Sequence, residues 1–172
     1  MIDRKAARVL GLLSLSFLAP AQAQDMTAPN GPPLMMVGGG TWETLRKNFI
    51  SPEVDVAYRS DQPCFWIIKP HMGVLASKDG SYYGWLGLYA DLHLTDHFVA
   101  SPSTAFGGWG GGGYNLGSHL EFRSGMDVAY KFDGGTRIGV GFYHASNAGI
   151  TRENGGSESL LLEFSVPVKR LF

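Results

Sequence analysis

The sequence lacks two features that would place it in familiar secreted or membrane classes. It has a single cysteine, Cys64, so an internal disulfide framework is excluded. Outside a short N-terminal stretch, no apolar run reaches the length of about 18 residues that a membrane-spanning helix needs. We therefore expect neither a disulfide-stabilised fold nor a helical membrane protein. We interpret Cys64 as a small buried or lipid-facing residue and not as a nucleophile.

An excess of positive charge is missing as well. The chain carries 14 Lys and Arg against 15 Asp and Glu, a formal net charge of −1. The first 23 residues hold three bases and one acid, which leaves a net charge of about −3 on the rest. Proteins that bind nucleic acid usually show a basic patch. This balance therefore argues against a nucleic-acid partner.

The N-terminal segment contains the three parts of a secretory signal peptide in the right order. Basic residues at 4–8 precede an apolar stretch at 9–18, which is too short to cross a bilayer as a helix. A small-x-small cleavage site follows at 21–23. We predict a signal peptide at residues 1–23 and a flexible, proline-containing lead-in at residues 24–33. A buried N-terminal helix is the alternative.

Glycine and aromatic residues are abundant, with 24 Gly and 12% Phe, Trp and Tyr. Many of them lie in β-like segments that are separated by turns containing Gly, Asp, Asn or Pro. An exported chain without a spanning helix is either a soluble periplasmic protein or a transmembrane barrel, whose alternating strands ordinary hydropathy misses. The strand candidates are 34–41, 52–60, 64–76, 81–92, 97–109, 118–132, 135–147 and 157–172.

The last three candidate strands each have two unlike faces. One face is apolar and the other is small or charged, as alternation of period two produces in a strand. Their lengths of about 11–15 residues suit tilted strands that cross a bilayer, which need about 9–11, whereas soluble strands commonly have about 5–6. We expect Ile138, Val140, Phe142, Leu160, Leu162 and Phe164 to face lipid, and Glu121, Arg123, Asp127, Lys131, Arg137 and Glu163 to face the lumen.

These patterns predict an all-β fold, an eight-stranded antiparallel transmembrane β-barrel, over residues 34–172. The chain ends on Phe172 after an alternating strand. Such a terminus is typical of the address that the outer-membrane barrel assembly machinery reads. We therefore expect the protein in the bacterial outer membrane, with that machinery as a partner.

Three side chains near the last predicted turn point to acyl-transfer chemistry. His144 and Ser146 are two residues apart, so both project from the apolar face of one strand. Glu158 occupies the apolar face of the next strand, and a hairpin between the two would place it beside His144. A serine nucleophile, a histidine base and a carboxylate that holds the imidazole are the parts of a hydrolase triad. A polar girdle at the membrane interface is the alternative.

The intervening loop contains hydrogen-bond donors for a developing oxyanion. These are the side chains of Asn147 and Asn154 and the backbone amides near Ala148 and Gly149. With both chain termini in the periplasm, this loop is extracellular. The three candidate catalytic side chains would then face lipid near the rim of the outer leaflet.

The same stretch resembles the PagL family of lipid A 3-O-deacylases. The most specific part is a His-x-Ser-Asn-Ala core with a glutamate fourteen residues after the histidine. The resemblance covers about the last third of the chain, whereas residues 34–110 share only length and strand rhythm with the family. The matching segments are Leu116-Gly117-Ser118, Leu120-Glu121-Phe122-Arg123, Gly139 to Ile150, Asn154-Gly155 and Glu158.

The resemblance implies that Ser146 is the nucleophile, His144 the general base and Glu158 the orienting acid. It links Asn147 and Asn154 with the oxyanion region. It also implies an eight-stranded barrel without metal or cofactor. The implied substrate is lipid A of lipopolysaccharide in the outer leaflet, which would lose an ester-linked acyl chain from the 3-position.

Two other functions stay open at this point. A non-enzymatic outer-membrane barrel, structural or adhesive, would need no triad. A soluble periplasmic lipocalin-like binder would turn its apolar faces inward. The oligomeric state, including a homodimer, is also open. The other histidines lack metal-ligand spacing and are expected at the interface or in the lumen; they are His71, His93, His97 and His119.

Overall fold

The computed structural model describes residues 31–171, which form nine strands and no helix. The predicted signal peptide and Phe172, the predicted assembly signal, lie outside the described residues. Within them, no helix is long and apolar enough to cross a membrane. The strands are β1 (Leu34–Trp42), β2 (Ser51–Arg59), β3 (Ile68–Ser77), β4 (Tyr82–Ala90), β5 (Leu92–His93), β6 (Phe98–Gly110), β7 (Leu120–Lys131), β8 (Arg137–Ser146) and β9 (Ser157–Pro167).

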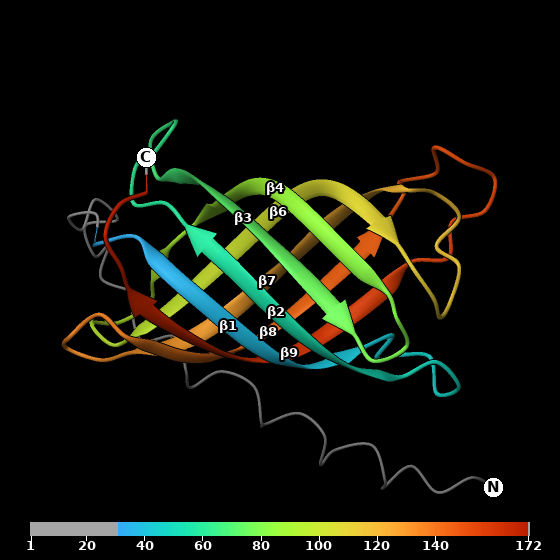
Figure 1. Cartoon of the computed structure of the whole chain (residues 1–172). Helices are drawn as coiled ribbons and strands as arrows, with labels where there is room; N and C mark the ends of the chain where they lie inside the picture. The colour runs from blue at the N-terminus through green and yellow to red at the C-terminus, as the bar shows by residue number, and fades with distance from the viewer. Residues whose placement is uncertain (1–30, 172) are drawn as a thin grey trace, which may run out of the picture.

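The strands close into a barrel. β4 and β5 both pair with β6 and are separated only by Asp91, so together they form one interrupted wall strand and the barrel has eight. Each wall strand pairs antiparallel with its neighbours in sequence, and β1 pairs with β9. Figure 1 shows the tilted strands running around the closed barrel, with loops at its two ends. The predicted eight-stranded antiparallel barrel is confirmed.

Most strand ends lie within two residues of the predicted ones, and two ends differ by more. β3 begins at Ile68 instead of residue 64, because the preceding residues form a turn. In that turn the Cys64 N–H donates to the Ile68 carbonyl at 2.9 Å, and Trp66 adopts a φ of 51°. β9 ends at Pro167, short of residue 172. Proline has no N–H to continue the ladder.

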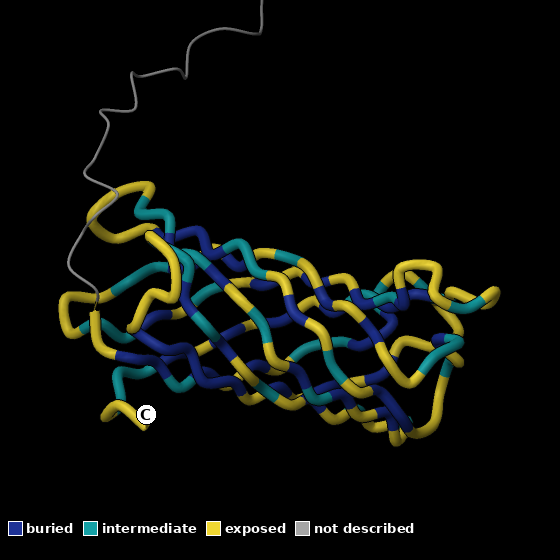
Figure 2. The backbone as a smooth tube through the Cα atoms, turned by 90° about the horizontal axis from the view of Figure 1, so that it is seen from above, coloured by how far each residue is buried: buried dark blue, intermediate teal, exposed yellow. Residues whose placement is uncertain are grey.

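The two faces of the barrel wall differ as predicted. Figure 2 shows buried and exposed residues alternating along the strands. The predicted lipid-facing residues are all 43–61% exposed, while Lys131, at the end of β7, is half-buried. An apolar exterior around a charged interior is the pattern of a membrane barrel and not of a lipocalin-like binder. The predicted lumen residues that are buried are Glu121, Arg123, Asp127, Arg137 and Glu163.

Charged side chains in the lumen form ion pairs that connect β2 with β7. Arg59 Nη2 lies 2.6 Å from Asp127 Oδ1, and Arg123 Nη2 lies 3.0 Å from Asp55 Oδ2. All four side chains are almost fully buried. A buried charge without a partner carries a large desolvation penalty, so each member of these pairs depends on the other.

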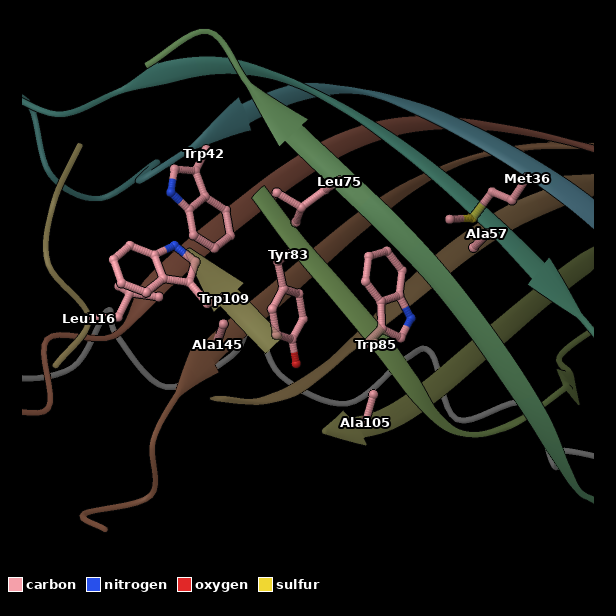
Figure 3. Close-up of a cluster of buried hydrophobic side chains, with 10 residues drawn as sticks. All are labelled: Met36, Trp42, Ala57, Leu75, Tyr83, Trp85, Ala105, Trp109, Leu116 and Ala145. Carbon is pink, nitrogen blue, oxygen red and sulfur yellow. The ribbon is translucent and has the colours of Figure 1, made fainter. Parts of the chain in front are cut away.

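The end of the lumen opposite Leu34 and Pro167, called the outer end below, is filled by apolar and aromatic side chains. Trp42, Tyr83 and Trp109 lie near the ends of three strands and pack with Leu116 of the β6–β7 loop (Figure 3). Ala145 of β8 belongs to the same cluster. Because Ala145 points inward, its two neighbours in sequence, which carry the predicted chemistry, point outward.

Candidate active site

The predicted histidine and glutamate lie opposite each other on β8 and β9. His144 and Glu158 are direct partners in the strand register. The His144 Nδ1 atom lies 3.1 Å from Glu158 Oε1, within hydrogen-bond distance. The His144 side chain is 46% exposed and that of Glu158 16%. The pair therefore sits on the outer surface of the barrel, with the imidazole open to the surrounding phase.

The imidazole leans towards the outer end, where Ser146 lies. Gly156 is the last residue before β9, and a β-carbon at this glycine would be 2.9 Å from His144 Cε1 and 3.6 Å from Nε2. Ser157 pairs with Ala145, so Gly156 is level with Ser146. The other ring nitrogen of His144, Nε2, therefore points towards the level of Ser146.

Ser146 is half-buried at the end of β8, two residues beyond His144. Its hydroxyl makes no hydrogen bond within the described part of the chain. Apo enzymes often show long or absent catalytic hydrogen bonds that form only when substrate binds. In this structure His144 and Glu158 are in contact, and Ser146 lies on the same face of the barrel, two residues from His144.

A second outward serine, Ser124, lies opposite His144 on β7. It was not among the residues predicted from the sequence, although it interrupts an otherwise apolar face between Phe122 and Met126. That interruption was a usable signal. Ser124 adds a further hydroxyl to the polar patch around the imidazole.

Asn147 and Asn154 organise the β8–β9 loop (residues 147–156). Asn147 is fully buried, and its Nδ2 donates to Thr151 Oγ1 at 2.9 Å and to the Glu153 carbonyl at 2.7 Å. Its oxygen accepts the Gly149 N–H at 2.9 Å. Asn154 Oδ1 accepts the Asn147 N–H at 3.1 Å. Of the two side-chain amides, that of Asn154 is the one without a hydrogen-bond acceptor within residues 31–171.

One buried carboxyl near this site was not predicted from the sequence. Glu43 follows β1 in the β1–β2 loop (residues 43–50), and its side chain is fully buried. Burial raises the pKa of Glu43 to about 7, although the nearby Arg46 opposes the shift. Its position next to β9 exists only because the barrel closes β1 onto β9, so no local pattern could have indicated it.

Among residues 31–171, no group of three or more His, Cys, Asp or Glu could hold a metal ion.

Comparison with known proteins shows the family of this chain. The family described as lipid A 3-O-deacylase (PagL) matches residues 51–167, more than half of the chain. The chain belongs to the PagL family. The lipid A deacylase PagL of Pseudomonas aeruginosa is 41% identical over 64 residues, a match that spans 37% of each chain. Family membership and the lipid-facing apolar exterior identify the protein as an outer-membrane barrel.

Solved structures support the fold. The crystal structure of the outer-membrane enzyme PagL superimposes with a TM-score of 0.60 at 19% identity, covering 78% of this chain and 99% of that one. A solved structure from the de novo design of transmembrane β-barrels gives a TM-score of 0.58 at 11% identity, covering 82% of this chain and 98% of that one. At these identities, both similarities show the fold alone.

Proposed function

We propose that this PagL-family protein is an outer-membrane esterase that removes an ester-linked acyl chain, the 3-O chain, from lipid A. Ser146 is the nucleophile, His144 the general base and Glu158 the residue that orients the imidazole. The observation that carries the proposal is the 3.1 Å contact between His144 and Glu158 on a surface that otherwise faces lipid. A carboxylate on such a surface costs free energy unless it has a partner and a use.

The reaction follows from these positions. Ser146 Oγ attacks the ester carbonyl while His144 Nε2 takes its proton, and Glu158 stabilises the imidazolium through Nδ1. The tetrahedral intermediate collapses as His144 returns the proton to the departing sugar oxygen. Water, deprotonated by His144, then attacks the acyl-serine, releases the fatty acid and restores the Ser146 hydroxyl. We assign the Asn154 amide and nearby backbone N–H groups to the oxyanion.

The position of the triad selects the substrate. An ester that reaches the outer rim from the side must belong to a lipid already packed against the barrel. Lipid A meets this demand, because its primary acyl esters lie at the height of the sugar headgroup. Phe142 and Leu160, exposed directly below the pair, provide an apolar surface for the acyl chains. Amide-linked chains should stay in place. A serine with a histidine base could in principle cleave an amide, so the selectivity comes from the position of these chains and not from the chemistry alone.

Mass spectrometry of lipid A tests the proposal. Lipid A from cells that produce the protein should be lighter by one hydroxy-fatty acid than lipid A from cells that produce Ser146→Ala. Folding of both proteins is checked by heat-modifiable electrophoretic mobility. Identical lipid A masses with both folded, under detergent-activated conditions, would favour the non-enzymatic barrel instead.

A further inference from the structure

The β1–β2 loop reaches across to the β8–β9 loop through one arginine. The Arg46 Nη2 group donates to the Gly155 carbonyl and, at 3.4 Å, to the Gly156 carbonyl. Its Nε lies 3.1 Å from Glu43 Oε2, an ion pair within the loop. Arg46 thus connects a buried carboxyl next to β1 with the backbone immediately before β9.

The Arg46 guanidinium is held in place from several sides. It lies over the Tyr114 ring at 4.0 Å, and Tyr114 meets Phe49 edge-on at 5.2 Å. Glu43 adopts a φ of 57°, a left-handed conformation that a non-glycine residue keeps only where its surroundings hold it. The Arg46 side chain is 33% exposed. This arginine is largely committed to the protein, in contrast to the exposed Lys47 beside it.

The backbone segment that Arg46 binds, Gly155–Gly156, also affects the geometry of the His144–Glu158 pair. Gly156 packs against the imidazole, with space for no larger side chain. Gly156 also lies two residues before Glu158. From the same β1–β2 loop, the Thr44 N–H donates to the Glu158 carbonyl at 3.0 Å. One loop therefore braces the chain both before and at Glu158.

We propose that Arg46, anchored by Glu43, is a positioning residue for the His144–Glu158 pair. It contacts no reacting atom and acts through Gly155 and Gly156. This inference rests on the proposed function. Displacement of a catalytic group by about 1 Å can cost about 100-fold in rate. Loss of Arg46 should therefore lower kcat and leave KM nearly unchanged, because the lipid-facing surface that binds the acyl chains stays intact.

The test compares Arg46→Ala and Arg46→Lys with Lys47→Ala as the matched control, in purified full-length protein with lipopolysaccharide in detergent micelles. We expect Arg46→Ala to lower kcat by about 10- to 100-fold with KM within about two-fold. Arg46→Lys should recover only part of the loss, since lysine lacks the planar fork that spans two carbonyls. Millimolar guanidinium should restore part of the kcat of Arg46→Ala but none of that of Ser146→Ala. Lys47→Ala should keep the wild-type kcat.

Several outcomes would overturn the inference. A folded Arg46→Ala protein with the wild-type kcat would do so, and so would a rise in KM alone, which would make Arg46 a contact for lipid A phosphate. If Arg46→Ala does not fold, Arg46→Lys and Glu43→Gln decide in its place by the same criteria. Activity in the wild type that Ser146→Ala retains in full would instead refute the proposed triad. The two failures are therefore distinguishable.

Discussion

Polar side chains occur in two regions of this barrel, in the lumen and on the outer surface of β7 to β9, and they are treated differently. In the lumen, Arg59 and Asp127 are 2.6 Å apart, almost fully buried, and closed to any third molecule. On the outer surface, His144 and Glu158 are 3.1 Å apart and the imidazole is open. Strand alternation creates both regions, but only the outer pair can meet a substrate. The lumen pairs connect β2 with β7 across the lumen, whereas the outer pair joins two strands that already pair with each other in the sheet.

Removal of the outer nucleophile or base should give the largest effect. Ser146→Ala and His144→Ala should each abolish nearly all deacylation, since the loss of either residue costs about 10⁶ in rate in a soluble serine hydrolase. The barrel should stay folded, because neither side chain contributes to the lumen. Release of fatty acid from lipopolysaccharide and heat-modifiable mobility measure the two properties. Deacylation at the normal rate by either folded variant would contradict the assignment.

Glu158→Ala should cost less. The carboxylate orients and stabilises the imidazole and does not react, so we expect a loss of about 10⁴ in kcat, below that of the other two variants. The measurement is kcat at saturating lipopolysaccharide. A loss equal to that of Ser146→Ala would mean that Glu158 has more than an orienting role.

The lumen should respond in the opposite way. Asp127→Ala leaves Arg59 buried without its partner and should lower the free energy of unfolding by about 3–5 kcal/mol. The folded fraction should keep nearly normal kcat, because the altered side chain lies on the other side of the wall. Urea unfolding in detergent gives the stability. A folded Asp127→Ala protein of normal stability but low activity would contradict the separation between a structural lumen and a catalytic outer surface.

Glu43 should give the smallest effect, and one that depends on pH. Burial raises the pKa of Glu43 to about 7 from 4.5, against the charge of Arg46 and the hydroxyl of Ser157, and Glu158 and Asp79 add to the rise. Because the pKa in the folded state is the higher one, its contribution to stability is complete below about pH 4.5. That contribution is lost as pH rises to about 7.

A Glu43→Gln variant removes this titration and keeps the shape. Between pH 4.5 and 7, the unfolding free energy of the wild type should fall by at most about 3 kcal/mol relative to that of the variant. Above pH 7 the difference should level off. Unfolding by urea at several pH values measures it. A difference that is flat across this range would show that the pKa of Glu43 is not raised.

The fold was largely predictable because the physical pattern is local. In β7, β8 and β9 each residue meets either lipid or lumen, so alternation alone separated Phe142 from Arg137. The opposition of His144 and Glu158 followed from the hairpin register. In contrast, the turn at Cys64–Ile68 and the break at Asp91 have no alternation signal.

The support around the site was not predictable for a different reason. Arg46 contacts Gly155 and Gly156 only because β1 pairs with β9. These glycines follow Arg46 in the sequence by 109 and 110 positions. The position of Glu43 depends on the same closure. Sequence periodicity carries no information about such contacts.

Covalent labelling tests the central claim most directly, namely that the outer polar patch is catalytic with Ser146 as its nucleophile. A fluorophosphonate reacts with an activated serine, whose oxygen displaces fluoride from phosphorus. Peptide mass spectrometry of the folded, labelled protein should find the phosphonate on Ser146, and the label should disappear in His144→Ala. Label on Ser124 instead, or label on Ser146 that persists at full rate without His144, would contradict the account.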